Sequence, residues 1–180
     1  MPLEITYAIF AGAVGGAVLF LPPDDRTTVP NSPRGSISLS LGHDKSAPGN
    51  AGGGAARHGF AGVDYLPSRR LFGEVRPILA AGVTPGGGAF VSAGIRQDYL
   101  IGRFRVTPHI GVAAYHSGRH GWEPRELLQF RTGLDVYYPV TEKVSLGIGY
   151  HHMSNAQLTS GIAPFSAGVN VIRVNVLYKL

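Results

Sequence analysis

The segment that decides the fold runs from residue 128 to residue 138 and reads LQFRTGLDVYY. One set of alternate positions is almost entirely apolar: Leu128, Phe130, Thr132, Leu134, Val136 and Tyr138. The intervening positions are mostly polar or small: Gln129, Arg131, Gly133, Asp135 and Tyr137. Because successive side chains of a β-strand point to opposite faces, this alternation predicts a strand with one apolar and one polar face.

The same alternation recurs through most of the chain. It predicts eight strands, near residues 35–43, 57–66, 70–83, 89–100, 103–116, 125–138, 143–154 and 168–180. The connections at 67–70, 100–103 and 139–143 are short, those at 44–56, 116–124 and 155–167 are longer, and 84–88 is a short exception. Short turns on one side and longer loops on the other are typical of barrels in the bacterial outer membrane.

The composition agrees with many short strands. The 180 residues include 26 Gly and 13 Pro, yet 44% are hydrophobic and only 15% are charged, which excludes a disordered chain. Cys is absent, so neither disulfides nor a thiolate site can form. The net charge of +5 is not gathered into Lys/Arg clusters interleaved with aromatic residues, so we expect no nucleic-acid partner and favour proximity to anionic lipid.

The polar face separates a soluble barrel from a membrane barrel. In a membrane barrel the apolar face contacts lipid and the polar face lines the interior, the lumen. The predicted lumen carries charges of both signs that can pair: Glu74, Arg76, Arg96, Asp98, Arg105, Arg131, Asp135 and Arg173. Strands of about ten residues also match the membrane thickness. The sequence therefore favours an all-β, eight-stranded antiparallel transmembrane β-barrel over residues 35–180, in the outer membrane of a Gram-negative bacterium.

The N-terminal segment differs in character. Residues 5–21 form an apolar run that ends at Pro22 and Pro23, and its length suits a signal peptide. No Lys or Arg precedes the run, where Glu4 stands instead, and no clear cleavage site follows it. We interpret residues 1–23 as a signal peptide and residues 24–34 as a linker. An N-terminal anchor and a buried helix are the alternatives.

Two polar side chains interrupt the lipid-facing set near the end of the seventh predicted strand. Val144, Leu146, Ile148 and Tyr150 share a parity that continues to His152 and Ser154. The same reasoning puts Asn170 on the outer face of the eighth strand, beside them. Polar residues facing lipid are costly unless they serve a function. A serine nucleophile needs a neighbouring base and a third group that orients that base, and these three residues fit that arrangement. Asn155 could supply a hydrogen bond to an oxyanion.

This segment resembles a known family of enzymes. His152-Met-Ser-Asn-Ala156 is similar to the H-x-S-N-A motif of the PagL-type lipid A 3-O-deacylases, and Gly168-Val-Asn170 is similar to the Gly-x-Glu or Gly-x-Asn segment of that family. The resemblance covers the last two predicted strands closely and the rest of the barrel in outline. It implies an esterase that removes the 3-O-linked 3-hydroxyacyl chain of lipid A without metal or cofactor. By that resemblance His152 is the base, Ser154 the nucleophile and Asn155 the oxyanion-hole candidate.

One departure concerns the third residue. The best-known members carry Glu where this chain has Asn170, and an amide can orient an imidazole but cannot stabilise an imidazolium by charge. No Asp or Glu follows Glu142 that could replace it locally. A milder departure is the C-terminal Leu180, where a terminal Phe is commoner.

The competing hypothesis is a structural or adhesive outer-membrane barrel with a vestigial, inactive His/Ser site. A pore is disfavoured, because side chains fill the lumen of eight strands. We interpret His151, of opposite parity to His152, as a structural lumen residue, and His109 and His116 lack the spacing of a metal site. The partners expected are therefore lipid A within lipopolysaccharide as substrate and the surrounding membrane, with a homodimer left open.

Overall fold

The computed structural model describes residues 34–44, 59–116, 127–154 and 169–180. They form the strands β1 (Ser36–Asp44), β2 (Gly59–Leu66), β3 (Arg76–Val83), β4 (Ala89–Arg96), β5 (Tyr99–Ile101), β6 (Phe104–His116), β7 (Leu128–Pro139), β8 (Val144–Ser154) and β9 (Val169–Lys179). Within these residues no helix is long and apolar enough to cross a membrane.

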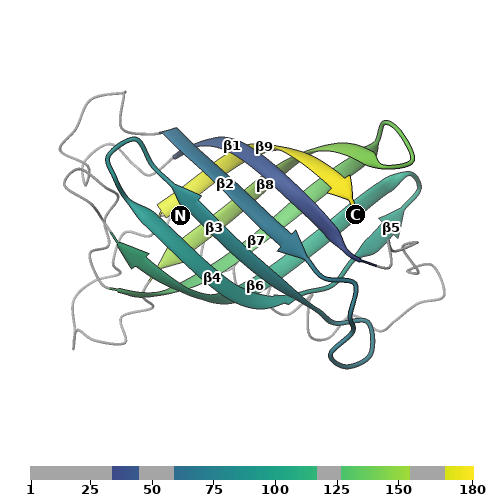
Figure 1. The fold of residues 1–180 in the computed structure, drawn as a ribbon, viewed down its shortest axis with the longest axis horizontal. Coiled ribbons are helices and arrows are strands. Elements are labelled where there is room, and N and C mark those ends of the chain that lie inside the picture. Colours follow the sequence, from purple (N-terminus) through teal and green to yellow (C-terminus); the bar gives the residue numbers. More distant parts are fainter. Residues whose placement is uncertain (1–33, 45–58, 117–126, 155–168) are drawn as a thin grey trace, which may run out of the picture.

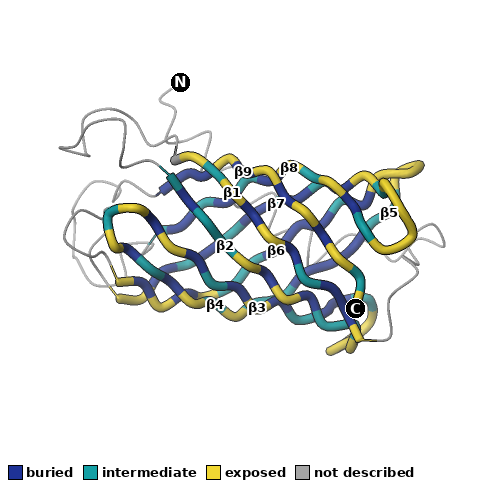
Figure 2. The backbone as a smooth tube through the Cα atoms, turned by 45° about the horizontal axis from the view of Figure 1, so that its top comes forward, coloured by how far each residue is buried: buried dark blue, intermediate teal, exposed yellow. Residues whose placement is uncertain are grey.

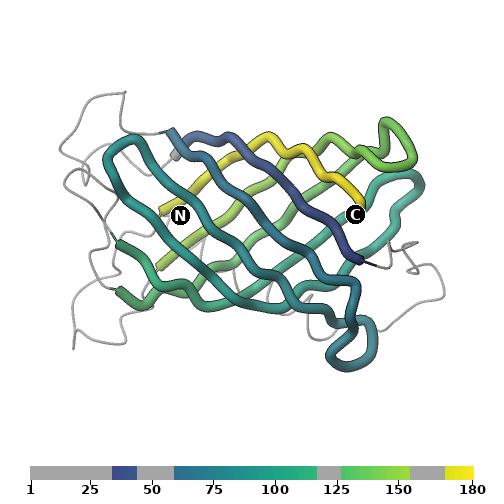
Figure 3. The backbone as a smooth tube through the Cα atoms, viewed as in Figure 1, coloured from purple at the N-terminus to yellow at the C-terminus, as the bar shows by residue number. Residues whose placement is uncertain are grey.

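The strands close into a barrel. Each is antiparallel to its neighbours in the order β4-β3-β2-β1-β9-β8-β7-β6, and a further pairing of β4 with β6 joins the two ends. The short β5 continues the line of β4, because both pair with β6. The result is a closed eight-stranded antiparallel β-barrel whose strands are tilted to its long axis (Figures 1 and 3), as the sequence predicts.

The side chains alternate as expected of a barrel in lipid. Buried and exposed positions follow one another along the strands (Figure 2). The exposed large side chains in the strands are mainly aliphatic: Leu39, Leu41, Leu79, Val83, Val91, Val112, Leu146, Ile148, Ile172, Val174 and Val176. The largest fully buried side chains include four arginines: Arg76, Arg96, Arg131 and Arg173. The apolar face therefore points outward and the charged face inward, the reverse of a soluble barrel.

Two predicted strands differ from the structure. The strand expected at 70–83 begins only at Arg76, because residues 71–75 form a tight turn. There Leu71 N donates to Val75 O at 2.9 Å and Gly73 has a φ of 50°, a conformation that favours glycine. Val75 is only 7% exposed in this turn.

The strand expected at 89–100 is interrupted at Gln97 and Asp98. The register across the gap is unchanged, since Arg96 pairs with His109 and Tyr99 with Val106. Gln97 N donates to Pro108 O at 3.2 Å, but Pro108 has no N–H to return the second bond of this pair. The missing donor accounts for the division into β4 and β5.

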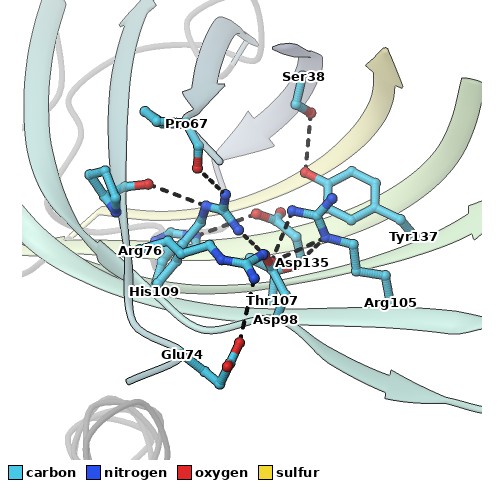
Figure 4. Close-up of polar contacts among 12 residues, drawn as sticks. Ser38, Pro67, Glu74, Arg76, Asp98, Arg105, Thr107, His109, Asp135 and Tyr137 are labelled. Carbon is cyan, nitrogen blue, oxygen red and sulfur yellow. Dashed lines mark hydrogen bonds and ion pairs between the residues drawn. The ribbon is translucent and has the colours of Figure 1, made fainter. Parts of the chain in front are cut away.

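The charged side chains of the lumen pair with one another in two groups. Near the short turns, Asp98 accepts hydrogen bonds from the guanidinium groups of Arg76, Arg96 and Arg105, and from the hydroxyl of Thr107 at 2.9 Å (Figure 4). Such convergence satisfies charges that would otherwise be costly to bury.

The second group lies deeper in the lumen. Arg173 lies between two carboxylates, with Nη2 2.8 Å from Asp135 and Nη1 2.6 Å from Asp64. Arg131 Nη2 is 3.1 Å from the same Asp64. The four residues lie on three strands, β2, β7 and β9. Because β2 and β7 are four strands apart around the barrel, the ion pair of Asp64 with Arg131 connects opposite walls.

Candidate functional site

The candidate site lies on two adjacent strands, β8 and β9 (Figure 1). Their antiparallel register places His152 directly opposite Asn170, and Tyr150 opposite Ile172. Side chains directly opposite on one face of a sheet have Cβ atoms about 5 Å apart, close enough for polar groups to bond. The pairing of the strands alone therefore brings an imidazole and an amide from distant parts of the sequence together.

The face of the barrel that carries these residues is the outer one. Leu146 and Ile148 are exposed to the surroundings of the barrel, and the same parity continues through Tyr150, His152 and Ser154, which are half-buried. The intervening His151 and Met153 are buried in the lumen. The structure thus places His152 and Ser154 on the lipid-facing side, at the end of β8.

Two hydrogen bonds converge on the amide of Asn170. His152 Nδ1 lies 2.9 Å from Asn170 Oδ1, and the Tyr150 hydroxyl donates to the same oxygen at 2.5 Å. Asn170 is only 7% exposed although it has the outward parity. The first distance is ordinary for an N–H···O hydrogen bond, and the second is at the short end of the range for O–H···O.

The contact with Asn170 determines which ring nitrogen of His152 carries the proton. A carbonyl oxygen can only accept, so an imidazole Nδ1 that bonds to Asn170 Oδ1 must carry the proton. The other ring nitrogen, Nε2, then has a free lone pair and can accept a proton. This is the form that a general base requires.

Ser154 is on the same face but is not bonded to the imidazole. Two residues along a strand correspond to roughly 7 Å between Cα atoms, and no hydrogen bond joins Ser154 to His152 in the part of the chain that the structure describes. Across the sheet, Ser154 pairs with Phe130 and His152 with Thr132 on β7. Catalytic hydrogen bonds are often loose without substrate, so this arrangement is compatible with a Ser/His pair. Asn155 lies outside the described residues.

Tyr150 was not among the predicted site residues. The sequence places it in the lipid-facing set, but its hydroxyl reaches Asn170, which is displaced by two residues from its own partner Ile172. Diagonal neighbours of this kind lie within reach of an aromatic side chain. Alternation alone could not reveal the contact, because it fixes the face of each residue and not the register between strands.

The other histidines of interest lie inside the barrel. His151 is fully buried, and its ring meets the rings of Phe60 and Phe90 edge-on, at centroid distances of 5.2 and 6.2 Å. His109 Nε2 is 3.5 Å from Asp135 in the deeper charged group. Among the residues that the structure describes, no group of three or more His, Asp or Glu side chains could hold a metal ion.

Comparison with known structures shows the same fold in outer-membrane barrels. The structure described as the outer membrane enzyme PagL has a TM-score of 0.54 and 16% sequence identity, with 81% of this chain and 99% of that chain covered. Neisserial surface protein A has a TM-score of 0.53 and 12% identity, over 81% and 96% of the two chains. A de novo designed transmembrane β-barrel has a TM-score of 0.50 and 10% identity, over 82% and 97%.

The likeness to these structures establishes the fold of the chain, while no curated protein matches the sequence. The sequence model of one family does match it, over residues 13–179, and this family is described as Lipid A 3-O-deacylase (PagL). That span includes β8, β9 and every strand before them. The chain therefore belongs to the PagL family of lipid A 3-O-deacylases.

Proposed function

We propose that the protein is an outer-membrane esterase that removes the 3-O-linked 3-hydroxyacyl chain of lipid A through a serine-histidine mechanism. The observation that carries the proposal is the hydrogen bond from His152 Nδ1 to Asn170 Oδ1, on the outer face of a barrel that belongs to this family. The bond leaves Nε2 available as a proton acceptor. A polar cluster on this face needs a function to offset its cost in hydrocarbon.

In the proposed reaction, Ser154 attacks the carbonyl carbon of the ester while His152 Nε2 takes the hydroxyl proton. The tetrahedral intermediate collapses, the bond to the sugar oxygen breaks, and His152 returns the proton to that oxygen. Water then attacks the acyl-serine with His152 again as base, which releases the 3-hydroxy fatty acid and restores Ser154. Asn155 is our candidate for holding the oxyanion.

The third member of the site is neutral in this chain. Asn170 can hold the imidazole and fix its tautomer, but it adds no negative charge beside the imidazolium that forms in the transition state. The Asn-oriented triad of papain-like cysteine proteases shows that an amide can serve in this position. We therefore propose an active enzyme in which orientation, and not charge, is the contribution of the third residue.

Mass spectrometry of lipid A tests the proposal. Cells of a Gram-negative host would express the wild type, Ser154→Ala, or Ser145→Ala, whose serine is on the same strand but buried in the lumen. We expect lipid A to lose the mass of one 3-hydroxyacyl chain with the wild type and with Ser145→Ala, and to stay intact with Ser154→Ala. Heat-dependent mobility of the folded barrel on gels would confirm that each variant folds.

Two results would contradict the proposal. Intact lipid A in cells with folded wild-type protein would favour the alternative, a structural or adhesive barrel with a vestigial site. Deacylation by Ser154→Ala at the wild-type rate would preserve the activity but exclude Ser154 as the nucleophile. A fluorophosphonate probe that labels the wild type and not Ser154→Ala would report the nucleophile independently of the substrate.

A further inference from the structure

Tyr150 takes a position in the site that the proposed mechanism does not use. It precedes His152 by two residues on the outer face of β8, and its hydroxyl bonds to the side-chain oxygen that also holds the imidazole. Asn170 is therefore held from two sides through one atom. The hydrogen bond from the Tyr150 hydroxyl to Asn170 is at the short end of the range for O–H···O hydrogen bonds.

An asparagine needs such a contact more than a glutamate does. The two ends of an amide differ, since Oδ1 accepts hydrogen bonds and Nδ2 donates them. If Nδ2 faced His152, then Nδ1 would have to accept, the ring proton would sit on Nε2, and the imidazole could not take a proton from Ser154. A half-turn of the Asn170 amide therefore converts the base tautomer into one that is inactive as a base.

The tyrosine hydroxyl favours the productive orientation. A phenol is a better donor than acceptor, because the lone pair of its oxygen is delocalised into the ring. It therefore prefers the carbonyl end of an amide to the NH₂ end. With Oδ1 turned toward Tyr150, the register of β8 and β9 places the same oxygen against His152 Nδ1.

We propose that Tyr150 is a positioning residue that keeps Oδ1 of Asn170 toward His152 and so maintains the tautomer of His152 that acts as a base. This inference rests on the proposed function. The neutral Asn170 requires a group that fixes the orientation of its amide. A carboxylate would not require one, because either of its oxygens accepts a hydrogen bond.

The test is a comparison of Tyr150→Phe in two backgrounds, the full-length wild type and Asn170→Asp, in detergent micelles that contain lipid A. Tyr150→Phe keeps the lipid-facing ring and removes only the hydroxyl. In the wild type, we expect kcat to fall about fivefold to tenfold, the factor that corresponds to one ordinary hydrogen bond, with KM unchanged. In Asn170→Asp the same change should alter kcat less than about twofold, because the carboxylate has no wrong end.

The outcomes separate the possible roles of Tyr150. An equal loss in both backgrounds would mean that the hydroxyl supports the fold or substrate binding, and it would overturn the inference. An unchanged kcat in the wild-type background would overturn it as well. A rise in KM without a fall in kcat would assign Tyr150 to substrate binding instead.

A spectroscopic measurement tests the inference without relying on turnover. The ¹⁵N shifts of histidine distinguish the Nδ1–H from the Nε2–H tautomer, and His152→Gln identifies the signal of His152 among the seven histidines. We expect Nδ1–H in the wild type and a substantial share of Nε2–H in Tyr150→Phe. If both show the same tautomer, the inference is wrong even where the esterase is active. If the tautomer changes but wild-type lipid A stays intact, the proposed function fails and the positioning contact stands.

Discussion

Replacing Asp135 by Asn is the sharpest test of how the barrel is stabilised. The carboxylate of Asp135 accepts from Arg173 Nη2 at 2.9 and 2.8 Å on its two oxygens and from Asn175 Nδ2 at 2.9 Å. His109 Nε2 lies 3.5 Å away, and all four side chains are buried. Asparagine has nearly the same shape, so the substitution removes the charge and one acceptor without opening a cavity.

The expected loss in the free energy of unfolding depends on the ion pair that Arg173 retains. Removing one partner of a buried ion pair typically costs about 3–5 kcal/mol, because the other charge stays buried without compensation. Arg173 retains Asp64 at 2.6 Å, so we expect the lower part of that range, about 3 kcal/mol. With a urea dependence of about 1–3 kcal/mol per M, the unfolding midpoint should fall by roughly 1–3 M.

The assay is urea unfolding of the refolded barrel in lipid vesicles, followed by tryptophan fluorescence and by mobility on unheated gels. Glu142→Gln is the matched control, since it removes an exposed carboxylate from the turn after β7 and should change stability by less than about 0.5 kcal/mol. If Asp135→Asn unfolds at the same urea concentration as this control, the buried ion pairs do not hold the walls of the barrel together, and our account of the lumen is wrong.

Two further predictions concern the site and its supporting strand. Asn170→Asp keeps an oxygen at the position now 2.9 Å from His152 Nδ1 and adds a charge. Because charged hydrogen bonds are about 1 kcal/mol stronger than neutral ones, kcat for lipid A should rise about fivefold. An unchanged or lower kcat would show that the missing charge of the third residue does not limit the reaction. Gly149→Ala would place a methyl group onto Asp135 Oδ1 and 2.9 Å from Arg173 Nε. The yield of refolded barrel on unheated gels should therefore drop sharply, and a normal yield would show that this ion pair can shift at little cost.

The sequence predicted the barrel well because alternation is a local property. From Leu128 to Tyr138 each residue has the face that its parity predicts, and the arginines expected in the lumen are there. The errors arose where backbone chemistry overrides the pattern. Gly73 turns the chain before β3, and Pro108 lacks the N–H that would have joined β4 to β5.

The placement of the candidate site residues on one face could be predicted in the same way. Parity brought His152, Ser154 and Asn170 to one face, and the structure shows His152 bonded to Asn170. The contact of Tyr150 with Asn170 could not be predicted from the sequence. It depends on the register between two strands, which the alternation within either strand does not determine.

The outward orientation of His152 and Ser154 has a consequence for kinetics. A substrate that reaches these groups arrives by lateral diffusion in the plane of one leaflet, so its effective concentration is a mole fraction in two dimensions. Adding inert lipid at constant total lipid A should slow the reaction, while diluting the whole suspension with buffer should leave the rate per enzyme unchanged. For such a protein the composition of the membrane, and not the volume of buffer, sets the concentration of substrate at the site.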